Sequence, residues 1–260
     1  MSDATTAISF EHIRVEFGGT LLAIDDFSLT IGTGEFVSIV GPSGCGKTTV
    51  LNLLTGLLPL EQGHIEILGK RPIAGNLDIA YMLARDSLLP WRTTLGNAAY
   101  GAEIREIEKS KRNARALELL HQVGLAGFEN HYPKALSHGM RQRCALARTF
   151  ALDSPVMLMD EPFGALDAQT KLQLEDLLLE LWQTERRTVV FITHDLSEAV
   201  ALSDRVIVMS ARPGRILADI AINLPRPRSV RSLQKDPAFH KIYSQVWTEL
   251  ERGIAESGKQ

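Results

Sequence analysis

The chain has 260 residues, of which 45% are hydrophobic and 23% are charged, and its formal net charge is −3. This composition is typical of a globular protein with a sizeable core, and the near balance of 28 basic and 31 acidic residues gives no overall attraction to nucleic acid. Two cysteines are too few for a disulfide framework, and no apolar stretch has the length of a membrane span. We therefore expect one large domain, or one domain with a small satellite, in a reducing compartment, without a secretion signal or a membrane span of its own.

The N-terminal region is predicted to form antiparallel strands. Apolar Ile13, Val15 and Phe17 alternate with polar residues, a pattern typical of a strand with one solvated face. The adjacent Gly18 and Gly19 indicate a turn. This alternation suits a core-facing position for Phe17.

Later apolar runs are continuous, which predicts strands that are buried on both faces of a parallel sheet. These runs are residues 36–40, 156–159, 189–193 and 206–209. A leucine-rich helical stretch, residues 170–182, alternates with them. Between about residues 95 and 148, apolar side chains including Ile104, Ile107, Leu117 and Leu120 recur at helical spacing. We interpret that segment as a helical insertion on the main sheet.

The last part of the chain is predicted to be a connector and a helix. The sequence LPRPR at residues 224–228 indicates an extended connector, and Asp236 and Pro237 suit the N-cap and first position of a helix. One face of that helix is apolar, formed by Phe239, Ile242, Tyr243, Val246, Trp247, Leu250 and Ile254. We expect this helix to dock on the body of the protein, with a dimer or regulatory contact as the alternative.

A phosphate-binding loop is predicted directly after the first apolar run. The pattern GxxxxGK[ST], with one further threonine, is matched by Gly41, Pro42, Ser43, Gly44, Cys45, Gly46, Lys47, Thr48 and Thr49. Glycines let successive backbone N–H groups point at phosphate oxygens. Lys47 would supply charge to the β and γ phosphates and Thr48 a hydroxyl to Mg²⁺, whereas Cys45 suits a small spacer better than a reactive thiol.

Polar residues follow two other apolar runs. Asp160 suits the carboxylate on the Mg²⁺ side, and Glu161 suits the group that orients or deprotonates an attacking water. His194 can donate a hydrogen bond to a γ-phosphate. Because the carboxyl ends of parallel strands share one edge of a sheet, we expect these side chains to meet the loop. Ser137 suits the N-cap of another helix, and by itself that pattern is either an ordinary cap or an anion-binding end.

In this order, over about residues 8–210, these pieces resemble the ATP-binding-cassette (ABC) family. Its Walker A loop, signature, Walker B segment, D-loop and switch histidine are matched by residues 41–49, 136–140, 157–161, 164–167 and His194. The resemblance implies a homodimer of cassettes that sandwiches two MgATP molecules head to tail. Ser137 and Gly139 of one chain would then complete the site built on Lys47 of the other. The resemblance also implies that Phe17 stacks on adenine. The alternation with Ile13 and Val15 equally suits a core-facing strand residue, so both positions stay open.

Three segments resemble the nitrate, sulfonate and taurine type of bacterial importer ATPase: residues 88–93 (LLPWRT), 210–216 (SARPGRI) and the connector. This implies a peripheral ATPase subunit on the cytoplasmic face of the inner membrane. Its partners would be permease subunits and, through the assembled transporter, a solute-binding protein, with no nucleic acid.

The implied fold is an α/β P-loop NTPase core with a mainly parallel sheet, an N-terminal antiparallel β subdomain and a helical signature subdomain. The cassette would span residues 1–224, with the helical subdomain at about 86–150. The connector and amphipathic helix would then span residues 225–260.

Two positions depart from the family pattern. Ala84 stands where the family has a glutamine that touches Mg²⁺ or the attacking water, and alanine has no donor or acceptor. We hypothesise that water or a neighbour substitutes and that turnover survives at a reduced or more tightly gated rate. His138, where glycine is commoner, adds bulk beside Ser137.

Two other functions compete with the importer ATPase. A soluble cassette protein acting on nucleic acid or ribosomes usually carries a second cassette or a long coiled-coil insertion, for which 260 residues leave no room. A regulatory subunit with attenuated hydrolysis would fit Ala84. The presence of Lys47, Asp160, Glu161 and His194 argues against that alternative.

Overall fold

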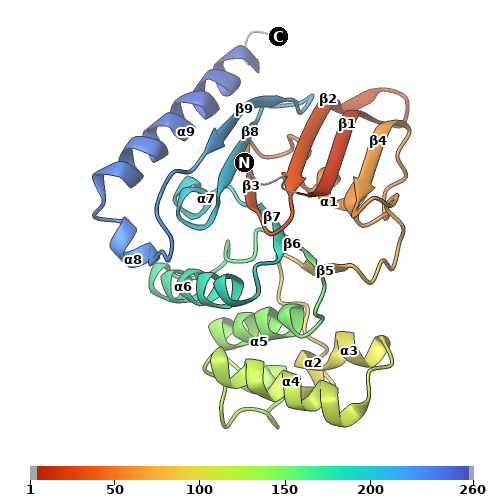
Figure 1. The fold of residues 1–260 in the computed structure, drawn as a ribbon, viewed down its shortest axis with the longest axis vertical. Helices are drawn as coiled ribbons and strands as arrows, with labels where there is room; N and C mark the ends of the chain where they lie inside the picture. Colours follow the sequence, from red (N-terminus) through yellow and green to blue (C-terminus); the bar gives the residue numbers. More distant parts are fainter. Residues whose placement is uncertain (1–4, 258–260) are drawn as a thin grey trace.

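The computed structural model describes residues 5–257, so the outer ends of the two predicted regions, residues 1–4 and 258–260, lie outside the described part. Two β-sheets and a group of helices make up the fold (Figure 1). One sheet is N-terminal and antiparallel and the other is mainly parallel, which confirms the predicted fold class. Within residues 5–257, no helix is both long and apolar enough to cross a membrane.

The larger sheet has six strands in the order β5-β6-β7-β3-β8-β9. Neighbouring strands are parallel except β9, which runs antiparallel to β8. The strands are β3 (Phe36–Val40), β5 (Ile79–Met82), β6 (Val156–Asp160), β7 (Thr188–Ile192), β8 (Arg205–Met209) and β9 (Ile216–Ala221). The four apolar runs form β3, β6, β7 and β8, whereas β5 and β9 are not among the predicted strands.

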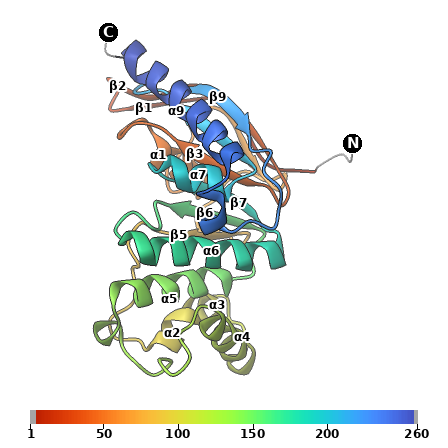
Figure 2. The ribbon, with the colours of Figure 1, turned by 90° about the vertical axis from the view of Figure 1, so that its left-hand side faces the viewer.

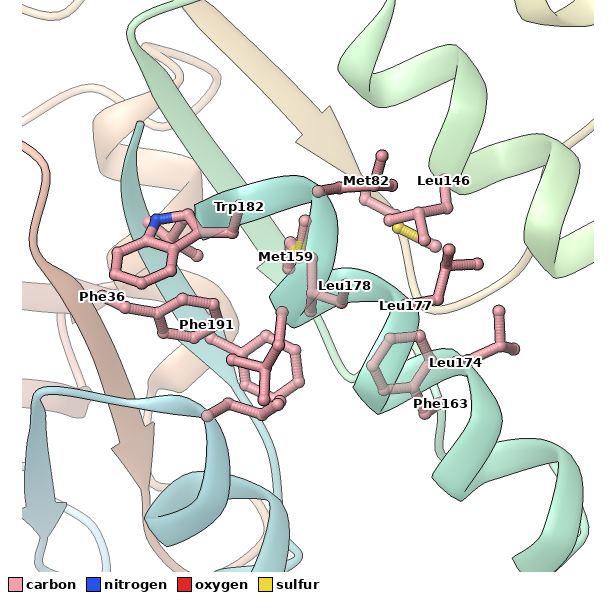
Figure 3. Close-up of a cluster of buried hydrophobic side chains, with 14 of the residues drawn as sticks. Phe36, Met82, Leu146, Met159, Phe163, Leu174, Leu177, Leu178, Trp182 and Phe191 are labelled. Carbon is pink, nitrogen blue, oxygen red and sulfur yellow. The ribbon is translucent and has the colours of Figure 1, made fainter. Parts of the chain in front are cut away.

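Apolar clusters cover both faces of this sheet. In β3, Phe36 and Val40 belong to the cluster on one face, and Val37 and Ile39 to the cluster on the other. Figure 3 shows the first cluster, in which Trp182 packs edge-on against Phe36 with ring centroids 5.5 Å apart. Double-sided burial explains why these strands are continuous apolar runs.

The smaller sheet has the order β2-β1-β4 and packs with the helix α1 (Lys47–Leu54) over the second cluster. Its strands are β1 (Thr6–Phe17), β2 (Leu21–Gly32) and β4 (Gln62–Ile67). Gly18 and Gly19 form the predicted turn with φ of 61° and 66°. Ile13 and Val15 are buried, but Phe17 at the end of the strand is 41% exposed. The alternative that Phe17 faces the core is therefore wrong, because the strand runs past the core there.

The predicted helical insertion consists of short helices beyond the main sheet (Figure 2). They are α2 (Thr94–Ala98), α3 (Tyr100–Ile104), α4 (Lys109–Gln122), the 3-10 helix η1 (Pro133–Ala135) and α5 (His138–Phe150). Glu106 has a φ of 58°, and the side chain of Glu108 caps α4 by accepting from the backbone N–H of Ser110. The chain thus turns between α3 and α4, which places Ile104 in solvent instead of on a continuous apolar face with Leu120.

Four further helices complete the fold: α6 (Ala168–Glu185), α7 (Leu196–Leu202), α8 (Val230–Leu233) and α9 (Pro237–Ser257). Asp236 caps α9 by accepting from the N–H of Ala238 at 2.8 Å, and the helix docks beside α7, β8 and β9 as expected. Phe239 and Val246 are buried, but Trp247 and Ile254 remain about half exposed. The apolar face of α9 is therefore only partly covered.

The connector before these last helices is anchored by two arginines. Arg228 is buried and donates to the backbone oxygens of four residues, Ala201, Ser203, Ile222 and Leu224. Burial lowers its pKa to about 10, so it stays charged at neutral pH. The guanidinium of Arg226 lies 4.2 Å from the ring centre of Trp182 and pairs with Asp204 at 2.8 Å. The division into a cassette and a C-terminal region at residue 224 stays a prediction.

Candidate functional site

The phosphate-binding loop after β3 has a tightly curled backbone that depends on its glycines. Gly44 and Gly46 have φ of 77° and 104°, a region that favours glycine, and Gly46 directly precedes α1. A Cβ on Gly41 would lie 2.9 Å from the sulfur of Cys45 and 3.0 Å from the carbonyl oxygen of Met209. These positions therefore need glycine for backbone conformation or for space.

Lys47 is held inside this loop. Its side chain is 7% exposed, and its Nζ donates to the backbone oxygens of Gly41 at 2.8 Å and Pro42 at 3.1 Å. The sulfur of Cys45 lies 3.9 Å from the same Nζ. Burial raises the pKa of the Cys45 thiol, so it stays protonated at neutral pH, which supports its predicted role as a spacer.

Thr48 and Asp160 form the next part of the site. Thr48 Oγ1 donates to Asp160 Oδ2 at 3.1 Å, which joins the first turn of α1 to the carboxyl end of β6. Burial raises the pKa of the Asp160 carboxyl, and the hydrogen bond from Thr48 partly offsets that rise. Two oxygen donors at this separation suit one side of a hydrated Mg²⁺ ion.

Glu161 and His194 meet at the ends of β6 and β7. Glu161 has a φ of 45° and its N–H donates to the oxygen of Ile192 at 2.8 Å. Its Oε2 lies 3.1 Å from Nδ1 of His194. A non-glycine residue in the left-handed region is a local strain that often accompanies functional sites. The backbone thus aims the carboxylate away from its strand and toward the imidazole.

These groups border a groove with a volume of about 340 Å³. Its lining includes Phe17, Leu21 and Ala23 from the antiparallel sheet, Ser43, Gly44, Gly46, Lys47, Thr48 and Thr49 from the loop and α1, and Glu161 and Arg212. The structure thus brings Phe17, the loop and Glu161 together in one chain. Asp160 and His194 contact this set through Thr48 and Glu161.

The signature segment does not line this groove. Ser137 is exposed and caps α5 by accepting from the N–H of Met140 at 3.3 Å. A Cβ on Gly139 would lie 2.8 Å from Cγ2 of Thr170, so the missing side chain lets α5 approach α6. Ser137 and Gly139 are therefore free of contacts with Lys47 within the described chain.

Tyr81 is a site residue that sequence reasoning misses. It lies on β5 opposite Leu158 of β6, on the same side as Asp160 two residues later. Burial raises the pKa of Tyr81 to about 12, and the hydrogen bond to Asp160 contributes to that rise. Ala84, which follows the end of β5, is exposed. A polar residue in the middle of a short apolar run was the available signal for Tyr81.

Directly after His194 in the chain, a partly buried cluster of charged groups joins α6 to α7. Lys171 Nζ contacts Asp195 Oδ2 at 2.6 Å and Glu198 Oε1 at 2.7 Å. Asp195 in turn caps α7 by accepting from the N–H of Ser197 at 2.8 Å. Glu175 is only 3% exposed, and burial together with the charge of Glu198 raises its pKa to about 8. The backbone around His194 is therefore fixed from two helices.

The strand–loop–helix unit and the groove define a P-loop nucleotide-binding site. The sequence profile of the ABC transporter family matches residues 24–164. An uncharacterized ABC transporter ATP-binding protein of Methanocaldococcus jannaschii is 46% identical over 220 residues, which cover 84% of this chain and 82% of that protein. The taurine import ATP-binding protein TauB of Escherichia coli is 41% identical over 236 residues, which cover 89% and 92% of the two chains.

A solved structure is similar as well. The ATP-binding cassette MJ0796, in a dimeric post-hydrolysis state bound to ADP and phosphate, is 30% identical with a TM-score of 0.70, over 84% of this chain and 100% of that one. This chain therefore belongs to the ABC transporter family, and it is a nucleotide-binding ATPase subunit of a transporter.

We predict that Glu175 makes the protein less stable as the pH rises from about 5 to 8. Its carboxyl has a pKa of about 8 in the folded protein against an ordinary 4.5, so the folded state binds the extra proton in this window. The free energy of unfolding should fall with rising pH by an amount on the order of 3–5 kcal/mol. Glu175→Gln removes this titration, so urea unfolding of that variant should depend less on pH.

Glu180→Gln, on the exposed side of the same helix, is the matched control. Its stability should follow that of the unmodified protein at every pH. Equal pH dependence of Glu175→Gln and the unmodified protein would show that Glu175 is not the group that titrates.

Proposed function

We propose that two copies of this chain form a homodimer that hydrolyses two MgATP molecules and drives the uptake of a small solute through a membrane permease. The observation that carries the proposal is the groove along which Lys47, the Thr48–Asp160 pair and the Glu161–His194 pair are arranged. ATP hydrolysis requires a positive charge that binds the phosphates, oxygen ligands that hold a cation, and a carboxylate that orients the attacking water.

Lys47, Thr48 and Asp160 bind the substrate in this proposal. Lys47 pairs with the β and γ phosphates, and the loop N–H groups complete the anion site. Thr48 and Asp160 hold Mg²⁺, which screens the phosphate charge. Across the described residues, no group of three or more His, Cys, Asp or Glu side chains could hold a metal ion, which fits an ion that takes its other ligands from phosphate and water.

Glu161 and His194 act on the attacking water and the γ-phosphate. Glu161 Oε2 orients the water and accepts its proton, since the carboxylate is partly exposed to the groove. His194 Nδ1 lies 3.1 Å from this carboxylate, and the imidazole donates a hydrogen bond to the γ-phosphate. Phe17, which is 41% exposed at the apolar end of the groove, stacks on adenine.

The second copy completes each site through Ser137 and Gly139. Ser137 is exposed and Gly139 is partly exposed at the start of α5, whose N–H groups and dipole suit the γ-phosphate of a nucleotide bound to the partner chain. The dimeric state of the related cassette MJ0796 supports this arrangement. The face that includes Ser137 is then part of an active site that one chain cannot build alone.

The importer assignment is supported by 41% identity to a taurine import ATP-binding protein. In this proposal the subunit is peripheral, on the cytoplasmic face of a bacterial inner membrane, with permease subunits and a solute-binding protein in the assembled transporter. The solute class is nitrate, sulfonate or taurine. A regulatory role with attenuated hydrolysis is not favoured, because Lys47, Asp160, Glu161 and His194 are all in place.

Glu161→Gln should lower the ATPase rate of the reconstituted transporter by about 100-fold or more, since the amide cannot accept a proton from water. Nucleotide binding should persist, because the phosphate-binding loop is unchanged. Phosphate release and binding of labelled ATP measure the two effects. Glu66→Gln, on the far side of the antiparallel sheet in β4, is the control, and an unchanged rate for Glu161→Gln would refute the assignment of Glu161.

Ala84→Gln should raise the ATPase rate of the same transporter by about 2–10-fold, because an amide can add a second protein contact to the attacking water that Glu161 orients. Steady-state phosphate release is the measurement, with Ala84→Leu as a control of similar bulk. A complete absence of hydrolysis in the unmodified transporter would refute the hypothesis that turnover survives with alanine.

The subunit should copurify with an integral membrane protein when it is isolated from its native cells in mild detergent. Vesicles that contain the pair and the solute-binding protein should accumulate solute in an ATP-dependent way. A binding screen of that protein with taurine, other sulfonates and nitrate would identify the solute. Repeated recovery with RNA or DNA instead would contradict the importer assignment.

A further inference from the structure

The turn between β8 and β9, residues 210–215, contributes Arg212 to the lining of the nucleotide groove. Figure 1 shows this turn next to β2. The N–H of Gly214 donates to the oxygen of Ala23 at 2.8 Å, and the N–H of Asp25 donates to the oxygen of Gly214 at 3.1 Å. A Cβ on Gly214 would lie 2.0 Å from the oxygen of Cys45, so the turn also packs directly on the phosphate-binding loop.

The turn is closed by its own hydrogen bonds. Ser210 and Arg215 bond through their backbones, with 2.9 Å from the Ser210 nitrogen to the Arg215 oxygen. Ser210 Oγ donates to the oxygen of Pro213 at 2.8 Å and accepts from the N–H of Arg215 at 2.9 Å. Arg212 therefore sits at the tip of a fixed turn.

The guanidinium of Arg212 points along the phosphate-binding loop. Its Nη2 lies 3.5 Å from the oxygen of Gly44, and the residue lines the same groove as Lys47 and Phe17. No carboxylate in the described part of the chain forms an ion pair with Arg212. Arg215, in the same turn, pairs instead with Asp25. One arginine of the turn is thus neutralised and the other presents its charge to the groove.

We propose that Arg212 binds the phosphate chain of the nucleotide from beside the loop, next to Gly44. A guanidinium offers a planar pair of donors that matches phosphate oxygens. Glu161 and His194 provide the groups for the γ-phosphate, whereas Arg212 contacts Gly44 in the middle of the loop. Arg212 therefore pairs with the phosphates that ATP and ADP share, and it adds affinity for both nucleotides alike.

Arg212→Ala should raise the Kd of both MgATP and MgADP about 10-fold. This is the effect expected from losing one hydrogen bond to a charged group, taken at the lower end of its range because the site is exposed. The inhibition constant of adenosine, measured by competition with labelled ADP, should change less than twofold, because adenosine has no phosphate. The KM for ATP should rise while kcat stays within about twofold, since the contact is present in the ground state and the transition state. Arg212→Lys should restore part of the affinity.

Arg215→Ala removes the same charge from the same turn and should leave both Kd values within twofold. Unchanged ADP affinity in Arg212→Ala, or an equal loss for ADP and adenosine, would overturn the proposal. The inference rests on nucleotide binding in this groove, which Lys47→Ala tests separately. If Lys47→Ala loses nucleotide binding and Arg212→Ala does not, the proposed role of Arg212 is rejected while nucleotide binding in the groove stands. These assays use the purified subunit and need no permease.

Discussion

The parallel register of β3, β6 and β7 is the constraint on which the active groove depends. Ile192 of β7 pairs with Ile39 of β3 on one side and with Asp160 of β6 on the other, so all three strands end at one edge. The phosphate-binding loop, Glu161 and His194 follow these ends. A slip of one residue would move a strand by about 3.3 Å and break the 3.1 Å contact between Thr48 and Asp160.

The side of the groove formed by the antiparallel sheet is held in place by contacts between the two sheets. The bridge between Ile24 of β2 and Gly214 fixes the antiparallel sheet against the β8–β9 turn. Apolar side chains, including Phe17, therefore line one end of the groove, and the cations Lys47 and Arg212 lie beside the loop. A ligand with an aromatic base at one end and a polyphosphate at the other matches this separation.

The sequence predicts the features whose signal is local. The strands β3, β6, β7 and β8 can be predicted because burial on both faces requires a continuous apolar stretch. The phosphate-binding loop can be predicted because its backbone conformation requires glycines at fixed positions. β5 has only four residues, and its Tyr81 contacts Asp160 through a pairing that no local pattern encodes. The place of Phe17 in the groove depends on where β1 leaves the core. The place of Arg212 depends on a turn that contacts the other sheet.

The first turn of α6 links the signature helix to the histidine. Gly139 of α5 packs against Thr170, and the next residue, Lys171, pairs with Asp195 beside His194. Packed interiors transmit displacement because they have little free volume. In the proposed dimer, a movement of α5 must therefore displace Thr170 or be resisted by it. The same turn carries Lys171, so a continuous set of contacts leads from the signature helix to Asp195, the residue after the histidine.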